Sequence, residues 1–252
     1  MDQRQLGSQG PWVNTIGFGA FKIGRNTQTK YGTLYPLPDE AEVARLLNGL
    51  LDLGVNYIDT APAYGLSEER IGSTIAHRRA EYVLSTKVGE AFEDGISTYN
   101  FSRAAIERSL ERSLRRLKSE VLDVVFIHSH ADDLAVQQDT DAVSTLQRFR
   151  EQKLVRQIGL SAKTVAGAQA ALAWADVLMV EYHLADRSSE AVITAAHGAG
   201  IGVVVKKALN SGTLSADDGL RFVLSHPGVS TVVVGTLNSQ HLLQNLDAVA
   251  GL

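Results

Sequence analysis

Eight short apolar runs, each followed by a segment with helical periodicity, constrain the fold of this 252-residue chain more than any other feature. The expected strands are Thr15–Gly19, Asn56–Asp59, Tyr82–Lys87, Leu122–His128, Val155–Ser161, Val177–Tyr182, Gly202–Lys206 and Ser230–Val234. The expected helices are Glu40–Leu53, Ser67–Ala76, Ser102–Leu117, Thr140–Gln152, Thr164–Ala173, Ser188–His197, Ala216–Ser225 and Ser239–Val249. Eight β-then-α units on a chain near the typical length of about 250 residues predict a single-domain (β/α)8 TIM barrel over residues 1–252. An open doubly wound sheet is the alternative.

The bulk properties of the sequence argue against several classes of protein. A formal net charge of −4 provides no basic surface for nucleic acid. No stretch approaches the ~20 apolar residues of a membrane span, and no apolar signal segment follows residues 1–5. The lack of cysteine excludes disulfides, thiolate catalysis and sulfur-ligated zinc. We therefore expect a cytoplasmic protein that acts on a small molecule as a monomer or a weak homo-oligomer.

Three consecutive strands, the second to the fourth, end on ionisable side chains. Asp59 ends the second strand, Lys87 the third and His128 the fourth, and Tyr64 follows Asp59 by five residues. Parallel α/β folds keep their chemistry at the carboxyl ends of their strands. We expect a carboxylate, an amine, an imidazole and a phenol to gather at one end of the sheet.

These four groups suit the reduction of a carbonyl, which needs a hydride donor and a proton for the developing alkoxide. An unperturbed tyrosine, with a pKa of about 10, is a poor acid near neutrality. The ammonium group of Lys87 would stabilise the phenolate of Tyr64 and lower that pKa, and Asp59 would hold Lys87 in place. His128 would hydrogen-bond the carbonyl and orient it. The pattern predicts general acid catalysis by a tuned acid.

Each of the four residues also has a purely structural interpretation. Asp59 can cap a turn, Tyr64 can lie on a surface loop, Lys87 can leave its strand for solvent, and His128 can be a satisfied buried histidine. Four such groups in register on successive strands favour a common site instead. His128 and His130 offer a metal-binding alternative, because residues two apart on a strand share a face. No third histidine or carboxylate-rich strand end completes a ligand set.

Two further segments bear on the site. Residues 24–38 form a long polar loop after the first strand, where a surface loop and a flap over the substrate are equally open interpretations. Arg4–Val13, which contains two glycines and a proline, is expected to form a hairpin that closes the bottom of the barrel.

The sequence resembles the aldo-keto reductase superfamily over almost its whole length. Residues 59–68, DTAPAYGLSE, resemble the family's aspartate–tyrosine signature, and residues 85–87, STK, its lysine signature. Residues 109–117 and 122–128 are similar to the family's helix and histidine strand. The resemblance implies a barrel that binds a nicotinamide dinucleotide without a Rossmann fold. It also implies Tyr64 as acid, Lys87 and Asp59 as its tuning pair, and His128 as the orienting residue.

The segments that would bind the cofactor match the family less closely. By position, the cofactor-binding residues are Gly19, Ala20, Ser161, Lys206, Leu209, Ser211, Gly235, Thr236, Asn238, Gln244 and Asn245. Ser161 resembles the serine that binds the nicotinamide carboxamide, but Ala162 replaces the asparagine that usually follows it, and Met179 stands where glutamine is expected. Lys206 occupies the position of an aromatic residue that often stacks on the nicotinamide. Only one of the adjacent Lys206 and Lys207 can face the barrel mouth.

The choice between NADP and NAD is open. Gly235 and His241 lie where many family members carry the lysine and arginine that neutralise the 2′-phosphate of NADP. Backbone N–H groups of residues 236–238, at the start of the last helix, remain available to a phosphate. The resemblance favours NADPH, but discrimination against NADH is expected to be weak.

The sequence as a whole predicts an oxidoreductase that transfers a hydride between NADP or NAD and the carbonyl of an aldehyde, ketone or sugar. A nucleotide-sensing regulatory protein of the same fold, without turnover, is one alternative. A metal-dependent barrel hydrolase that uses His128 and His130 is another. The substrate and the physiological direction do not follow from the sequence.

Overall fold

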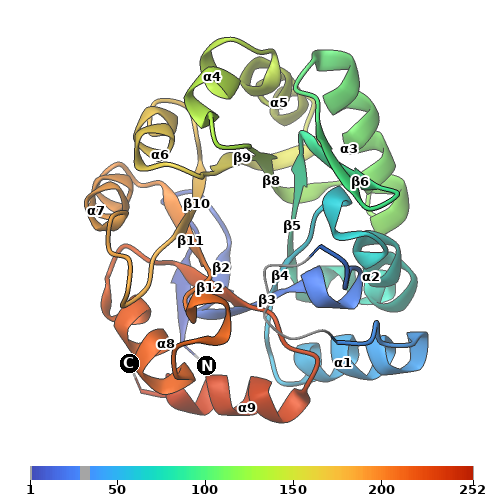
Figure 1. The fold of residues 1–252 in the computed structure, drawn as a ribbon, viewed down its shortest axis with the longest axis vertical. Coiled ribbons are helices and arrows are strands. Elements are labelled where there is room, and N and C mark those ends of the chain that lie inside the picture. Colours follow the sequence, from blue (N-terminus) through green and yellow to red (C-terminus); the bar gives the residue numbers. More distant parts are fainter. Residues whose placement is uncertain (1, 29–34, 252) are drawn as a thin grey trace.

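The structure, a computed structural model, describes residues 2–28 and 35–251 and is a closed barrel of eight parallel strands (Figure 1). The strands run around the barrel in the order β10–β11–β12–β3–β4–β5–β8–β9. Their bounds are β3 Ile16–Gly19, β4 Tyr57–Asp59, β5 Val83–Val88, β8 Leu122–His128, β9 Val155–Ser161, β10 Val177–Glu181, β11 Gly202–Lys206 and β12 Thr231–Val234. All eight expected strands are present within two residues of their predicted ends. The closed barrel confirms the predicted architecture and rules out the open sheet.

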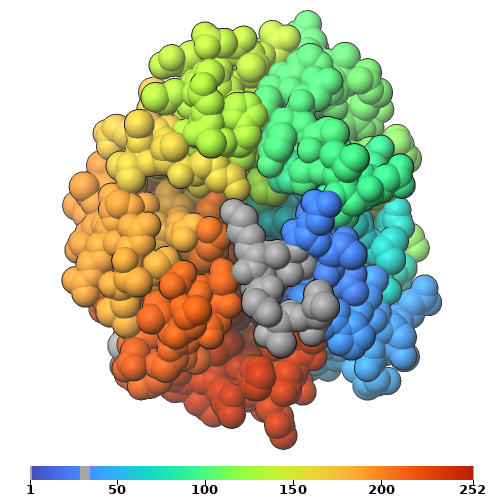
Figure 2. All heavy atoms as spheres, viewed as in Figure 1, coloured from blue at the N-terminus to red at the C-terminus, as the bar shows by residue number. Residues whose placement is uncertain are grey.

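Helices surround the barrel and cover the outer face of every strand (Figure 1). Their bounds are α1 Glu40–Asp52, α2 Ser67–Ile75, α3 Arg103–Leu117, α4 Asp133–Gln138, α5 Ala142–Glu151, α6 Val165–Ala171, α7 Glu190–Gly198, α8 Ala216–Ser225 and α9 Ser239–Ala248. Short 3-10 helices are η1 Ala20–Ile23, η2 Pro62–Tyr64, η3 Ala76–Glu81 and η4 Asn210–Gly212. Eight of the nine α-helices in the described part of the chain were expected, and α4 was not. Figure 2 shows the surface of the same face, with the segments in sequence order around the barrel.

Alternating side chains along each strand build two apolar layers, which explains why the strands read as continuous apolar runs. Val124 and Phe126 of β8 face the barrel interior together with Val177, Met179 and Val204. Their neighbours Val125 and Ile127 face the opposite way and pack in the larger layer between strands and helices, as do Leu178, Val203 and Val205. A slip of one residue in the pairing of two strands would move every side chain to the other face of the sheet. Because each face packs against its own layer, the pairing register is fixed, and so are the positions of the strand ends.

The N-terminal hairpin closes the bottom of the barrel, as predicted. β1 (Gln3–Gln5) pairs antiparallel with β2 (Trp12–Asn14). Leu6 and Val13 are fully buried in the interior layer, and the backbone oxygen of Leu6 accepts a 3.0 Å hydrogen bond from Gln157 Nε2 of β9. The chemistry is therefore confined to the opposite end of the barrel.

A second hairpin, at the active end of the barrel, was not predicted. β6 (Glu90–Glu93) pairs with β7 (Ile96–Tyr99) through a turn at Asp94 and Gly95, whose φ angles are 50° and 80°. An Asp-Gly dipeptide between two short runs is the sequence signal of such a turn, because both positions require positive φ. Because these two strands are mostly polar, a search of the sequence for apolar runs does not detect them.

The expected flap, residues 24–38, lies only partly within the described residues, because 29–34 fall outside them. No helix of the described part of the chain is long and apolar enough to cross a membrane.

Candidate active site

Strand register brings the predicted strand-end groups to one end of the barrel. β4 and β5 pair so that Asp59 lies opposite Ser85, and Lys87 follows two residues later on the same face of β5. β8 pairs with β9 so that His128 lies opposite Ser161. Residues from four neighbouring strands therefore meet at the carboxyl end of the sheet, where parallel barrels place their chemistry.

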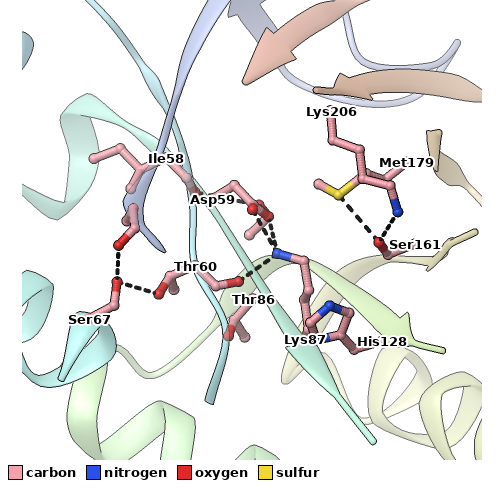
Figure 3. A network of polar contacts seen from close by, with 12 residues as sticks. Ile58, Asp59, Thr60, Ser67, Thr86, Lys87, His128, Ser161, Met179 and Lys206 are labelled. Carbon is pink, nitrogen blue, oxygen red and sulfur yellow. Dashed lines mark hydrogen bonds and ion pairs between the residues drawn. The ribbon is translucent and has the colours of Figure 1, made fainter. Parts of the chain in front are cut away.

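Lys87 and Asp59 form a buried ion pair (Figure 3). Lys87 Nζ lies 2.7 Å from Asp59 Oδ1 and 2.6 Å from Oδ2, and it donates a third hydrogen bond of 2.8 Å to the backbone oxygen of Thr60. All three ammonium hydrogens are thus used. Asp59 Oδ1 also accepts from Ser85 Oγ at 2.8 Å. Burial lowers the pKa of Lys87 and Asp59 opposes that shift, so the carboxylate keeps a charged amine in a water-excluded position.

Tyr64 ends the short helix η2 directly above this pair. Lys87 Nζ lies 4.7 Å from the centroid of the Tyr64 ring, within the range of a cation–π contact. Phe21 packs edge-on against the same ring at 5.1 Å between centroids. The backbone behind the ring is fixed by Gly24 and Gly65, since a Cβ on either would lie within 2.3 Å of the other segment's backbone. The phenol is therefore held by close backbone approach as well as by its neighbours.

His128 completes the group from the next strand. Its ring lies edge-on to Tyr64 with centroids 6.0 Å apart, and its Nδ1 lies 2.9 Å from Glu90 Oε2. Both side chains of this contact are about 10% exposed. Burial lowers the pKa of His128 to about 4, against which Glu90 acts only in part. The imidazole is therefore neutral near pH 7.

These groups open into a chamber of about 680 Å³ at the mouth of the barrel. Its lining contains Asp59, Tyr64 and His128 of the predicted catalytic set. The predicted cofactor residues in the lining are Gly19, Ser161, Lys206, Ser211 and Gly235. Among the described residues, the lining leaves out Ala20, Leu209, Thr236, Asn238, Gln244 and Asn245. Leu209 packs against the barrel's outer apolar layer instead, and Asn238 caps α9 by accepting a hydrogen bond from the backbone of Gln240.

The two adjacent lysines at the end of β11 both line the chamber, so the expectation that only one would face the barrel mouth is wrong. Lys207 lies beyond the strand with a φ of 57°, so the alternation of a strand does not apply to it. Lys206 Nζ donates to Ser161 Oγ at 2.9 Å and to the backbone oxygen of Ala162 at 2.8 Å. Lys207 turns toward β10 and forms an ion pair with Glu181. Ser161 in turn donates weakly to the sulfur of Met179 at 3.5 Å (Figure 3). The expected carboxamide-binding hydroxyl is thus already engaged by a lysine.

Sequence reasoning missed several residues of the chamber wall, among them Glu90 and Arg25. Glu90 begins the unpredicted hairpin three residues after Lys87. Arg25 lies with its guanidinium carbon 3.3 Å from the centroid of Phe92 and donates to the backbone oxygen of Ala63 at 3.1 Å. It therefore ties the loop after β3 to both the hairpin and η2. Recognition of the Asp94–Gly95 turn would have placed Glu90 near the site.

The metal-binding alternative gains no third ligand. In the described ranges 2–28 and 35–251, no group of three or more histidine, aspartate or glutamate side chains is arranged to hold an ion. His130 Nδ1 accepts a 3.1 Å hydrogen bond from the backbone of Asp132, and its ring packs edge-on against Tyr99 and Phe101. His130 therefore has a structural environment of its own.

Comparison with known proteins agrees with this geometry. The model of the "Aldo/keto reductase family" matches residues 15–219. The chain belongs to this family. A crystal structure of a putative aldo-keto reductase from Pseudomonas aeruginosa is 41% identical, with a TM-score of 0.91 over 98% of this chain and 94% of that one. Pyridoxine 4-dehydrogenase of Escherichia coli is 30% identical over 76% of this chain and 68% of its own length. D-threo-aldose 1-dehydrogenase of a Pseudomonas species is 27% identical over 82% and 69%.

Aldo-keto reductases are NAD(P)-dependent oxidoreductases that act on small carbonyl compounds, and this chain is such an enzyme. Its chamber fits a nicotinamide dinucleotide in two respects. The volume lies within the roughly 300–1,000 Å³ of small-molecule sites. Lys163, Lys206 and Lys207 belong to its lining, and lysine ammonium groups complement phosphates.

Proposed function

We propose that this enzyme reduces the carbonyl of a small polar aldehyde, ketone or sugar, with Tyr64 as the general acid. The observation that carries the proposal is the buried Lys87–Asp59 pair beneath the face of the Tyr64 ring. When bound, a reduced nicotinamide supplies hydride to the carbonyl carbon. Tyr64 then gives its phenolic proton to the developing alkoxide oxygen, a step that typically contributes about 10²–10⁴-fold to the rate.

Lys87 acts on Tyr64 through its charge. Because its three N–H groups bind Asp59 and Thr60, its effect on the phenol comes from the position of the ammonium over the ring. A positive neighbour stabilises the phenolate that forms as the proton leaves. Asp59 holds the ammonium in place and prevents the buried lysine from losing its proton. Together they form the tuning pair, while neutral His128 orients the carbonyl from the neighbouring strand.

A polar substrate suits the composition of the chamber wall. Glu90, Ser97, Tyr99 and Asp186 line it with carboxyl and hydroxyl groups that pair with the hydroxyls of a polyol. Two relatives are named for polar compounds of different kinds, an aldose and pyridoxine. We therefore propose a hydroxylated carbonyl compound as the substrate class.

Weak discrimination between NADPH and NADH is proposed for the cofactor. His241 is an exposed residue of α9, and Gly235 provides no side chain for a phosphate. The N–H groups at the start of α9 offer contacts that do not depend on a side-chain charge. NADPH remains the favoured form by resemblance to the family.

The test combines binding with turnover. Fluorescence titration with NADPH and NADH should give saturable binding of both. Steady-state assays across a panel of aldehydes, ketones and aldoses should then show turnover that Tyr64→Phe removes. Tight nucleotide binding without turnover of any member of the panel would instead favour a nucleotide-sensing protein.

A further inference from the structure

Lys206 takes no part in the proton transfer proposed above, although it faces the same chamber (Figure 3). It lies on the wall formed by β9 to β11, across from Tyr64. Its Nζ donates to Ser161 Oγ and to the backbone oxygen of Ala162. Neither acceptor carries a charge. This environment differs from that of Lys87, which faces a carboxylate.

The charged groups around Lys206 leave its own charge uncompensated. Lys163 after β9, Lys87 on β5 and Lys207 beside it are positive neighbours, and Glu181 on β10 is the negative one. Lys87 is matched by Asp59, and Glu181 is already paired with Lys207. Among the ion pairs of residues 2–28 and 35–251, none includes Lys206. When Lys206 is protonated, its ammonium therefore projects a positive potential into the chamber.

Any nicotinamide that reacts must lie in this chamber. Hydride transfer requires reacting atoms about 3–3.5 Å apart while the carbonyl oxygen meets the phenol of Tyr64. Tyr64 and Lys206 line one space of about 680 Å³. A ring held there shares the chamber with the Lys206 side chain, and charges interact over ~10 Å at physiological salt.

We propose that Lys206 makes the enzyme select the reduced nicotinamide over the oxidised one, so that it is loaded for carbonyl reduction from a mixed cofactor pool. This inference rests on the proposed function and identifies carbonyl reduction as the direction of hydride transfer. The oxidised ring carries a positive charge, whereas the reduced ring is neutral. The phosphates are the same in both forms. An ammonium in the chamber therefore repels only the oxidised form, and the ratio of the two dissociation constants isolates this effect from phosphate binding.

The selection should depend on pH. Burial lowers the pKa of Lys206 well below its ordinary value, and Lys163, Lys87 and Lys207 act in the same direction, while Glu181 opposes them. The charge on Lys206 is therefore present at low pH and lost as pH rises. Preference for the reduced cofactor should decline along with it.

The experiment measures Kd for NADPH and NADP⁺ by fluorescence and calorimetry, without turnover. In the wild type at pH 6, the ratio Kd(NADP⁺)/Kd(NADPH) should exceed that of Lys206→Met by about ten-fold or more, which is about 1.4 kcal/mol. Lys206→Arg should keep the ratio of the wild type at pH 6. It should hold that ratio as pH rises, whereas the ratio of the wild type falls toward that of Lys206→Met, because arginine stays charged. Tyr64→Phe serves as the background for the pH series, so that titration of the phenol does not contribute.

A matched control removes a neighbouring lysine together with its carboxylate. The double variant Lys207→Met, Glu181→Gln keeps the net charge of the chamber and should leave the ratio within about two-fold of the wild type. A ratio unchanged by Lys206→Met at pH 6 would overturn the inference, as would a ratio for Lys206→Arg that falls with pH like the wild type. If Lys206→Met does not fold, the arginine series alone decides. Failure of every variant and of the wild type to bind either cofactor would defeat the proposed function, and the inference with it.

Discussion

The two walls of the chamber contain the same unusual element, a lysine at a strand end, in opposite electrostatic settings. Lys87, on the β4–β5–β8 wall, is 1% exposed and bound by both oxygens of Asp59. Lys206, on the β9–β11 wall, binds a hydroxyl and a carbonyl and has positive neighbours. The carboxylate fixes the charge of the first lysine, whereas the second responds to its surroundings. In the functions proposed above, this contrast would hold one cation constant for proton transfer and let the other respond to the ligand.

The largest effect is expected on the catalytic wall from Tyr64→Phe. This change removes the phenolic proton and leaves the ring between Phe21 and His128, so kcat should fall by about 10²–10⁴-fold while cofactor Kd values stay within about two-fold. Steady-state kinetics and fluorescence titration measure the two quantities. A kcat near that of the wild type would remove Tyr64 from the role of proton donor and leave the wall without an acid.

Removal of the Lys87 ammonium should lower both the rate of turnover and the stability of the protein. Lys87→Met leaves the Asp59 carboxylate buried and unpaired, which should lower the free energy of unfolding by about 3–5 kcal/mol. It should also raise the apparent pKa of the kinetic acid, because the phenolate loses its positive neighbour. Denaturant unfolding and the pH profile of kcat are the measurements.

A charge-neutral partner variant separates these two effects. Asp59→Asn combined with Lys87→Met removes both charges and should recover most of the lost stability, but not the rate. A pH profile that matches the wild type in either variant would show that Lys87 does not tune Tyr64.

At the start of α9, beyond β12, a substitution that adds a cation for the 2′-phosphate is expected to change cofactor preference by about ten-fold. Charge-assisted hydrogen bonds contribute roughly 1.5–3 kcal/mol each, and Gly235 and exposed His241 supply no fixed cation. His241→Arg should therefore increase the preference for NADPH over NADH by about ten-fold, and His241→Gln should not. Fluorescence titration with NADPH and NADH measures the preference. A wild-type preference above about a thousand-fold would mean that other cations, such as Lys206 or Lys207, bind the phosphate.

The smallest effect is expected at His128, whose imidazole should not change its protonation state between pH 5 and pH 8. Burial holds its pKa at about 4, below the ordinary value of 6.5, so it gains a proton only at acid pH and stays neutral from pH 5 to pH 8. Ring ¹⁵N shifts, assigned by comparison with His128→Asn, should be constant across this range. A midpoint above pH 6 would show that Glu90, 2.9 Å away, dominates over burial.

The sequence was sufficient for the barrel and for the meeting of the strand-end groups on the β4–β5–β8 wall, because both depend on local patterns. Strands buried on both faces appear as uninterrupted apolar runs, and each ionisable group ends its own run, as Asp59, Lys87 and His128 do. Their meeting then follows from parallel register. The β6–β7 hairpin escaped because its strands are short and polar, although Asp94 and Gly95 carried the turn signal.

The contacts of the opposite wall lay beyond the sequence. The bond from Lys206 to Ser161 joins residues 45 positions apart on strands that are not neighbours, since β10 lies between them. No local pattern specifies which acceptor a lysine reaches across an intervening strand. Sequence position identified Lys206 as a departure from the family, and only the structure shows what it touches. Which residues hold the cofactor, in particular those outside the chamber lining, remains a prediction.

Closure of the barrel has a consequence for how the protein is made. β12 pairs with β3 with Val232 opposite Ile16, and the hydrogen bond from Thr231 to Thr15 beside this pair spans 216 residues. Arg4 of the N-terminal hairpin binds the backbone oxygens of Leu224 and Val229, and both chain ends lie on the same side of the barrel (Figure 1). At a synthesis rate of about 5–20 residues per second, the first strand waits roughly 10–40 s for its partner. During that time the edge of β3 stays open on the ribosome, so a chaperone that covers it would act on the N-terminal quarter of the nascent chain.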